Sequence, residues 1–365
     1  MKIKELTQYL ESIAPLAYQE SYDNSGLLVG DPNDEIQKAL ISLDCTEAVV
    51  DEAIAKGCDL IISHHPIVFK GLKKFNNKNY VERTVIKAIK NNIALYAIHT
   101  NLDNVFGGVN SKIAEKLGLI NTAILSPKKN QLKKLVVYVP RASVEEVREA
   151  LFEAGAGSIG DYDECSFNSA GYGTFRPLAG ANPTIGQIGE QERVEETKIE
   201  VVYSGIRERE ILLAMFAAHP YEEVSYQIVT LENSIASIGA GIIGNLATPL
   251  SPTDFLAYIK DGLKLNCIRH TKLIDTKIER VAICGGAGGF LLADAKRSGA
   301  DVFITADYKY HEFFDAEDEL IIADIGHFES EQFTQELLLD IIQKKFATFA
   351  VLLTEIDTNP IKYYC

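Results

Sequence analysis

The stretch CDLIISHHP, residues 58–66, joins an apolar run directly to a pair of histidines. A short, continuous apolar run is typical of a strand that is buried in a parallel sheet. The runs LYAI (95–98) and IIADI (321–325) also lead into histidines, His99 and His327. Open α/β sheets bind their ligands beyond the carboxyl ends of such strands. The stretch therefore predicts an α/β fold in which histidines gather at strand ends.

The two ends of the chain follow the same plan, in which helical and strand-like patterns alternate. In residues 1–126 we expect an N-terminal helix, a helix from Thr46 to Gly57, helices at 81–91 and 108–117, and strands at 39–43, 60–63 and 93–98. In residues 233–365 we expect helices at 252–264 and 288–298, and strands at 280–284, 301–305 and 321–325. The segments GCDLIIS (57–63) and GADVFIT (299–305) are also similar in sequence. We infer two related α/β halves that arose by internal duplication.

Residues 127–232 have a different character and are expected to form an inserted domain. Strands at 133–139, 199–203 and 224–231 and helices at 144–154 and 207–218 fit the order of a ferredoxin-like α+β domain. The segment 186–200 is charged and mostly polar, which predicts a solvated loop.

Five side chains that follow the predicted strands are candidate metal ligands: His64, His65, Asp103, His327 and Glu331. Imidazole and carboxylate suit zinc, with iron, manganese and nickel as alternatives. His327 and Glu331 are four residues apart at an apparent helix start, so they share one helix face. Five ligands exceed the needs of one tetrahedral ion, whereas a bridging Glu331 could join two ions about 3.5–4 Å apart. We therefore expect two divalent metal ions per chain.

Other residues near these strand ends have open roles. His99 is a candidate for catalytic proton transfer, with a sixth ligand and a partner that orients Asp103 as alternatives. His311 either reaches the cleft that the candidate metal ligands would form or is a structural histidine. Asp44 either supports a ligand or, as we favour, caps the helix that Thr46 opens.

Two further motifs are ambiguous. The loop CGGAGG (284–289) follows a strand and precedes a helix, but it lacks the lysine of a P-loop and the spacing of a dinucleotide fingerprint. Close backbone packing is therefore favoured over phosphate binding. The motif HPYEE (219–223) is either an effector or metal site or a turn before an edge strand.

Composition limits the classes of partner. The chain of 365 residues has 36 Lys and Arg against 51 Asp and Glu, a formal charge of −15, which argues against nucleic-acid or anionic-membrane partners. No signal-like segment or membrane-spanning run is apparent, so a cytoplasmic location is expected. The six cysteines form no CxxC pair, which predicts reduced thiols and no zinc knuckle.

Five motifs in order resemble the Nif-three-like family, whose members carry the label GTP cyclohydrolase I type 2 homologue. They are DNSGLLVG (23–30), SHHP (63–66), HTNLDN (99–104) with GGVN (107–110), YKYH (308–311) and GHFESE (326–331). Tyr22 stands where the family often has tryptophan, a difference that concerns packing. The resemblance implies a toroidal homohexamer, a dinuclear metal site on the same five ligands, and a CutA/PII-like insert with a motif like HPYEE.

Two functions fit these expectations. The first is a dimetal hydrolase of a nucleotide-like or phosphorylated small molecule, with His64, Asp103 and Glu331 on one ion, and His65, His327 and Glu331 on the other. The second is a non-enzymatic protein that carries metal or binds a partner. Open coordination positions would favour the enzyme.

Overall fold

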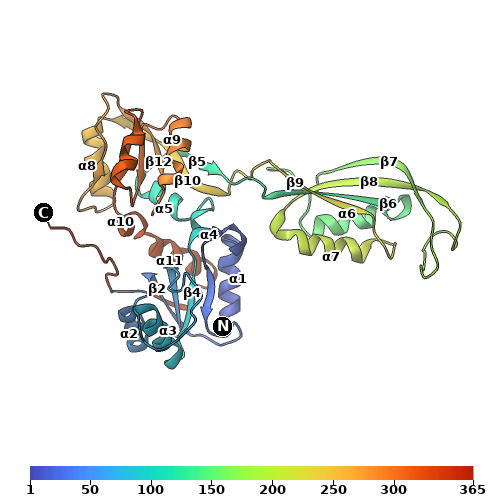
Figure 1. Ribbon diagram of the computed structural model, residues 1–365, viewed down its shortest axis with the longest axis horizontal. Coiled ribbons are helices and arrows are strands. Elements are labelled where there is room, and N and C mark those ends of the chain that lie inside the picture. Colours follow the sequence, from blue (N-terminus) through green and yellow to red (C-terminus); the bar gives the residue numbers. More distant parts are fainter. Residues whose placement is uncertain (365) are drawn as a thin grey trace. The chain divides into compact units, whose positions relative to one another are not determined.

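The computed structural model describes residues 1–364, which form two compact units (Figure 1). The first unit contains Met1–Pro127 and the chain from Ala236 onward, and the second contains Lys128–Ile235. Within residues 1–364, no helix is both long and apolar enough to cross a membrane. Five cysteines of the described chain are free thiols: Cys45, Cys58, Cys165, Cys267 and Cys284.

The first unit contains two sheets with equivalent centres. The order of the five-stranded sheet is β1 (Gly26–Val29), β4 (Ala94–Ala97), β3 (Leu60–His65), β2 (Lys38–Asp44) and β15 (Ala350–Leu353). The order of the six-stranded sheet is β11 (Arg269–His270), β14 (Ile321–Asp324), β13 (Val302–Thr305), β12 (Ile278–Ile283), β10 (Gly239–Leu250) and β5 (Ile120–Pro127). Three consecutive strands run parallel in each, β2 to β4 and β12 to β14. The mixed α/β class predicted from the sequence is confirmed.

The two sheets exchange edge strands. β5 follows the N-terminal sheet in sequence but pairs with β10 of the six-stranded sheet. β15 follows the C-terminal sheet in sequence but pairs in parallel with β2 of the five-stranded sheet. Neither sheet is therefore built from one end of the chain alone.

The helices of the first unit largely follow the expected pattern. They are α1 (Ile3–Ile13), α2 (Glu47–Lys56), α3 (Tyr80–Lys90), α4 (Thr100–Asp103), α5 (Val109–Lys116), α8 (Pro252–Gly262), α9 (Leu292–Arg297), α10 (His327–Glu331) and α11 (Thr334–Lys345). The Thr46 hydroxyl accepts from the Val49 amide, and Gly57 ends α2 with a φ of +63°. The helix expected at 288–298 is shorter, because residues 289–291 form a 3₁₀ turn before α9.

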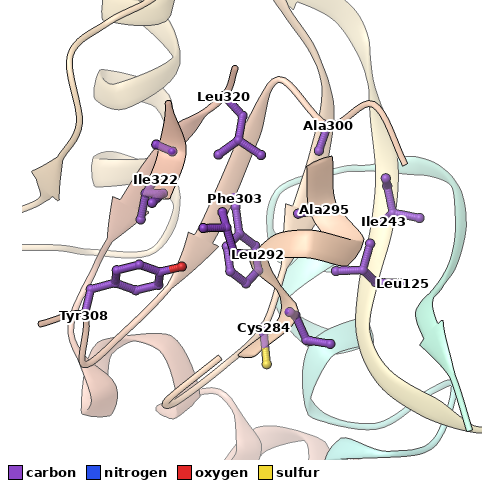
Figure 2. Packing of buried hydrophobic residues seen from close by; sticks show 13 residues of the cluster. Leu125, Ile243, Cys284, Leu292, Ala295, Ala300, Phe303, Tyr308, Leu320 and Ile322 are labelled. Atoms are coloured by element: carbon purple, nitrogen blue, oxygen red, sulfur yellow. The ribbon is translucent and has the colours of Figure 1, made fainter. Parts of the chain in front are cut away.

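Apolar side chains on both faces explain the continuous apolar strands. Leu40 and Ile41 of β2 are fully buried although they point to opposite faces. In the six-stranded sheet, Phe303 of β13 packs in one cluster with Leu292 of α9 and Ile322 of β14 (Figure 2). Both cores hold the carboxyl ends of the parallel strands in fixed positions.

The second unit has a four-stranded antiparallel sheet in the order β7 (Ser166–Phe175), β8 (Glu192–Ser204), β6 (Leu132–Pro140) and β9 (Tyr226–Leu231). Helices α6 (Val144–Glu153) and α7 (Glu208–Ala218) pack on it through a separate core that includes Val137, Ile199 and Met215. The elements follow one another as strand, helix, strand, strand, helix, strand.

The prediction of a loop at 186–200 is wrong from residue 192 onward, where β8 begins. Its backbone pairs with β7 from Glu192 and with β6 from Glu196, and such pairing does not require apolar side chains. Charged residues on β8 are also neutralised locally, since Glu200 lies 2.8 Å from the Lys134 ammonium group. The partner strand β7 is rich in glycine and polar residues, which hid the hairpin from pattern analysis.

Candidate metal centre

Three strand ends of the first unit supply the candidate ligands. His64 and His65 are the last residues of β3, and Asp103 ends α4, which follows β4. His327 begins α10 just after β14, and Glu331 ends the same short helix. The structure brings these five side chains into one cluster.

Glu331 lies at the centre of the cluster and is only 3% exposed. Its Oε1 lies 3.9 Å from His64 Nε2, and its Oε2 lies 3.0 Å from His65 Nε2 and 3.2 Å from His327 Nε2. Asp103 Oδ1 lies 3.7 Å from His64 Nε2. The two oxygens of Glu331 therefore face two different groups of ligands.

Several of these atoms are buried without a hydrogen bond. His64 Nε2, Asp103 Oδ1 and Glu331 Oε2 have no hydrogen-bond partner within the described chain. An unsatisfied buried polar atom costs on the order of 1–3 kcal/mol. A bound cation would satisfy all three atoms, so the donor set fits a divalent metal.

The outer nitrogen of each candidate histidine is held in place. His64 Nδ1 donates to the Ile98 carbonyl over 2.8 Å. His65 Nδ1 lies 2.8 Å from Asp44 Oδ1, and His327 Nδ1 lies 2.7 Å from Asp307 Oδ2. Donation from Nδ1 leaves the Nε2 lone pair free for a metal. The 3.3 Å approach of His65 Nε2 to His327 Nε2 would then be repulsive without a cation or proton between them.

The titration of the cluster reflects burial and excess negative charge. Complete burial lowers the pKa of His64 to about 3, which keeps this ring neutral. Burial also acts to lower the pKa of His65 and His327, but nearby carboxylates outweigh it. Asp44 and Glu331 raise the pKa of His65 to about 10. Glu331 and Asp307 raise the pKa of His327 to about 9. Protons therefore compete with any cation at this site.

The two carboxylates shift in opposite directions. Burial and the neighbouring Glu331 raise the pKa of Asp103. Burial also acts to raise the pKa of Glu331, but the neighbouring His327 and His65 rings lower it below its usual range.

His99 lies beside the cluster. Its ring centroid is 5.2 Å from that of His64 and 5.3 Å from that of His65, and it offers a nitrogen within 4.8 Å of ligand atoms on both. Its Nδ1 lies 2.8 Å from Asp23 Oδ1, while the Thr100 amide donates to Asp23 Oδ2 over 3.0 Å. The structure thus gives His99 a fixed orientation toward the cavity.

The capping role favoured for Asp44 is wrong, and of the two roles left open for His311 the structure does not support a place in the cleft. Asp44 holds His65 and does not cap α2, because Thr46 already performs that role. His311 is exposed in a 3₁₀ turn and is not among the residues that line the site cavity. Its ring contacts Tyr310 instead, with centroids 5.2 Å apart.

Sequence reasoning missed Asp23 and Asp307, which orient His99 and His327. The internal repeat contained a signal for Asp307. When GCDLIIS (57–63) is aligned with GADVFIT (299–305), His65 and Asp307 occupy equivalent positions. The first repeat thus has the candidate ligand His65 at the position where the second has Asp307, which supports a different candidate ligand, His327.

The glycine-rich loop packs against Glu331. A Cβ atom on Gly286 would lie 2.4 Å from Glu331 Oε1, and the φ of Gly286 is +63°. The Gly286 amide donates to Ser330 Oγ over 2.9 Å. Close packing explains these glycines without a phosphate ligand.

The HPYEE motif in the second unit is structural at its histidine. His219 Nε2 lies 3.0 Å from the Tyr138 carbonyl, and Nδ1 accepts from the Tyr221 amide over 3.1 Å. Both nitrogens are engaged by the backbone, so His219 is not available as a ligand.

Four of the five candidate ligands line a cavity of about 470 Å³ within the first unit. His65, His99, Asp103, His327 and Glu331 line it together with Tyr22, Phe69, Phe290 and Phe328, and with residues 359–361 near the C-terminus. This volume lies in the range of about 300–1,000 Å³ that small-molecule sites occupy.

Comparisons with known proteins agree with this architecture. Two relatives are named GTP cyclohydrolase 1 type 2 homolog. The one from Bacillus subtilis is 41% identical over 99% of this chain and 98% of its own length. The one from Halalkalibacterium halodurans is 40% identical over 98% of this chain and 97% of its own length. A crystal structure of a Bacillus cereus protein related to NIF3 has a TM-score of 0.83 at 39% identity, covering 100% of this chain and 99% of that one. A Staphylococcus aureus structure has a TM-score of 0.80 at 32% identity, with the same coverage.

The family model described as Duf34/NIF3 (NGG1p interacting factor 3) matches residues 1–360. The resemblance drawn from the five motifs is thereby confirmed. Since the match and the relatives both span nearly the whole sequence, the chain belongs to the Duf34/NIF3 family.

Proposed function

We propose that this protein binds two divalent metal ions per chain and is a metal-dependent hydrolase of a nucleotide-like or phosphorylated small molecule. The observation that carries the proposal is the buried Glu331, which lines a cavity and whose two oxygens face three histidine Nε2 atoms. Zinc is our first choice because it favours imidazole and carboxylate, with iron, manganese or nickel as alternatives. The name of the relatives supports a nucleotide-like substrate.

The ligands divide between the two oxygens of Glu331. His64, Asp103 and Glu331 would hold one ion, and His65, His327 and Glu331 would hold the other. When bound, such ions polarise the attacked group and lower the pKa of a water molecule. The five side chains supply fewer donors than two ions accept, so substrate and water have room to bind.

His99 is the proposed proton carrier. Asp23 holds its Nδ1, which leaves Nε2 as the atom that takes a proton from the reacting group or returns it. The same contact keeps the ring oriented toward the cavity that His99 lines.

Metal content is the first test of this proposal. We expect close to two metal ions per chain after exchange with zinc, manganese or iron, and loss of both in Glu331→Ala. His311→Ala is the matched control, because His311 is exposed and lies outside the cavity lining. One ion or none per wild-type chain in elemental analysis would contradict the dinuclear site.

Turnover is the second test. The metal-loaded protein should hydrolyse at least one member of a panel of phosphoesters and nucleotides. His99→Ala should lower kcat by about 10²- to 10⁴-fold while metal content stays unchanged. Full metal content without turnover across the panel would favour the rival function, a protein that carries metal or binds a partner.

The wider organisation is also part of the proposal. The strand order β9-β6-β8-β7 supports a ferredoxin-like, CutA/PII-like insert at residues 127–232 between related halves at 1–126 and 233–365. The family resemblance supports a toroidal homohexamer, for which light scattering after size-exclusion chromatography should give the mass of six chains. We also infer a cytoplasmic location, which cell fractionation would test.

A further inference from the structure

Three large aromatic side chains line the metal cavity while remaining exposed. Tyr22 is 67% exposed, Phe69 48% and Phe290 69%, and all three belong to the lining. Single exposed aromatic residues are common on protein surfaces, but a group around one cavity marks a binding site. The Phe69 ring also stands edge-on to His99, with centroids 5.7 Å apart, so one aromatic wall reaches the proposed proton carrier.

The charges on the cavity wall are one-sided. Among the described residues that line it, Glu20, Asp44, Asp103 and Glu331 are acidic, and none is lysine or arginine. Proteins that recognise phosphate groups normally present arginine, lysine or a helix N-terminus to them. No side chain of this wall carries a fixed positive charge, so the proposed metal ions are the main positive charges that a ligand meets.

The proposed metals leave little charge to spare. Two divalent ions bring four positive charges. Asp103 and Glu331 neutralise two of them as ligands, and Asp44 and Asp307, which hold His65 and His327, neutralise two more. The chain as a whole carries a formal charge of −15. A polyphosphate chain would therefore gain little long-range electrostatic attraction from this site.

The three asparagines of the wall already form hydrogen bonds within the protein. Asn110 Oδ1 accepts from the Gly285 amide over 2.9 Å, and Asn104 Nδ2 donates to the Tyr18 carbonyl over 2.9 Å. Asn359 Nδ2 donates to Glu329 Oε1 over 3.0 Å. The aromatic faces are thus the main surface left for recognising the part of a ligand that does not touch the metals.

We propose that the site selects a planar heteroaromatic compound with at most one anionic group, such as a nucleoside, over a nucleoside polyphosphate. The ring would stack at the aromatic mouth formed by Tyr22, Phe69 and Phe290, and its reacting group would face the metals and His99. This inference rests on the proposed metal-dependent function and narrows its substrate class.

Binding measurements on the full-length, zinc-loaded protein test the inference without relying on activity. Isothermal titration calorimetry would compare guanosine, GTP and inorganic triphosphate, which separate the ring from the phosphates. Elemental analysis would follow each titration, because triphosphates can remove divalent ions. Phe290→Ala and Tyr22→Ala would be compared with Phe314→Ala, a residue that is also 67% exposed but lies outside the cavity lining.

We expect saturable binding of guanosine and a GTP affinity no higher than that of guanosine. Phe290→Ala and Tyr22→Ala should each weaken guanosine binding by about 5- to 100-fold, the range of stacking on one aromatic ring. Phe314→Ala should bind guanosine as the wild type does, and zinc content should be equal in all variants.

Three results would overturn the inference: no saturable binding of guanosine, a GTP affinity higher than that of guanosine, or unchanged guanosine binding in both aromatic variants. Each of these results with zinc retained would leave the dinuclear site intact. A wild-type protein that holds neither zinc nor iron, manganese or nickel would instead refute the proposed function itself.

Discussion

The candidate centre depends on residues that fix the direction of other side chains. Asp44 and Asp307 hold the outer nitrogens of His65 and His327, so both Nε2 atoms point at Glu331. His64 achieves the same orientation with a backbone carbonyl. Because two of these three supports are carboxylates, they also add basicity to the ligands.

Removing a supporting carboxylate should therefore weaken metal binding without removing a ligand. We expect Asp44→Asn or Asp307→Asn to lower metal affinity by about 10- to 100-fold. Competition with a chelator of known affinity would measure the change. Asp275→Asn, at an exposed position, is the control. Wild-type affinity in both support variants would show that the two carboxylates are dispensable.

Gly286 tests how closely the backbone approaches Glu331. Gly286→Ala places a Cβ atom 2.4 Å from Glu331 Oε1 and also strains a φ of +63°. Gly57 has the same φ but no atom within 4 Å of its Cβ position, so Gly57→Ala reports the backbone strain alone. We expect each variant to lose about 1–2 kcal/mol of unfolding free energy from strain, measured by chemical denaturation.

Only Gly286→Ala should also lose metal, because only there must Glu331 move. Elemental analysis of the two variants side by side would separate strain from displacement. Equal metal content in both would mean that Glu331 adjusts without cost to its ligand role.

At the scale of elements, continuous apolar runs were sufficient to predict the parallel strands. β2, β3 and β13 are buried on both faces, and burial of that kind leaves a continuous apolar signal. β8 and β7 lacked that signal because their polar side chains lie on a largely exposed hairpin. The roles of Asp44 and Asp307 were hidden for another reason: a supporting carboxylate is recognisable only once its histidine has a position in space.

The segment after β15 is an element whose role no motif revealed. Thr358 donates to Asp44 Oδ2 over 2.7 Å, and residues 359–361 line the cavity. Thr358→Val removes the hydrogen bond at nearly constant volume, whereas Thr358→Ser keeps it. We expect metal release to a chelator to be several-fold faster in Thr358→Val than in Thr358→Ser, since a hydrogen bond to a charged group contributes about 1.5–3 kcal/mol. Equal release rates would limit this segment to lining the cavity.

At the scale of the whole molecule, the two units have separate cores, and only the first unit contributes side chains to the candidate metal centre. All five candidate ligands and their supports belong to the first unit. The second unit is stabilised by its own cluster of buried residues around Ile199 and Met215. A ligand that binds only the folded form of one unit stabilises that unit alone.

Metal removal should therefore lower the thermal stability of one unit and spare the other. In differential scanning calorimetry we expect two transitions, of which EDTA shifts only the one that belongs to the first unit. A free metal concentration about 1,000 times Kd stabilises by about 4 kcal/mol, which is large compared with typical effects of single substitutions. In Glu331→Ala the transition of the first unit should occur at the reduced temperature both with and without EDTA. That result would show that the shift in the wild type arises from metal bound at this site. If EDTA moved both transitions together, the two units would unfold as one cooperative structure, and metal binding would stabilise the insert as well as the α/β unit that holds the ligands.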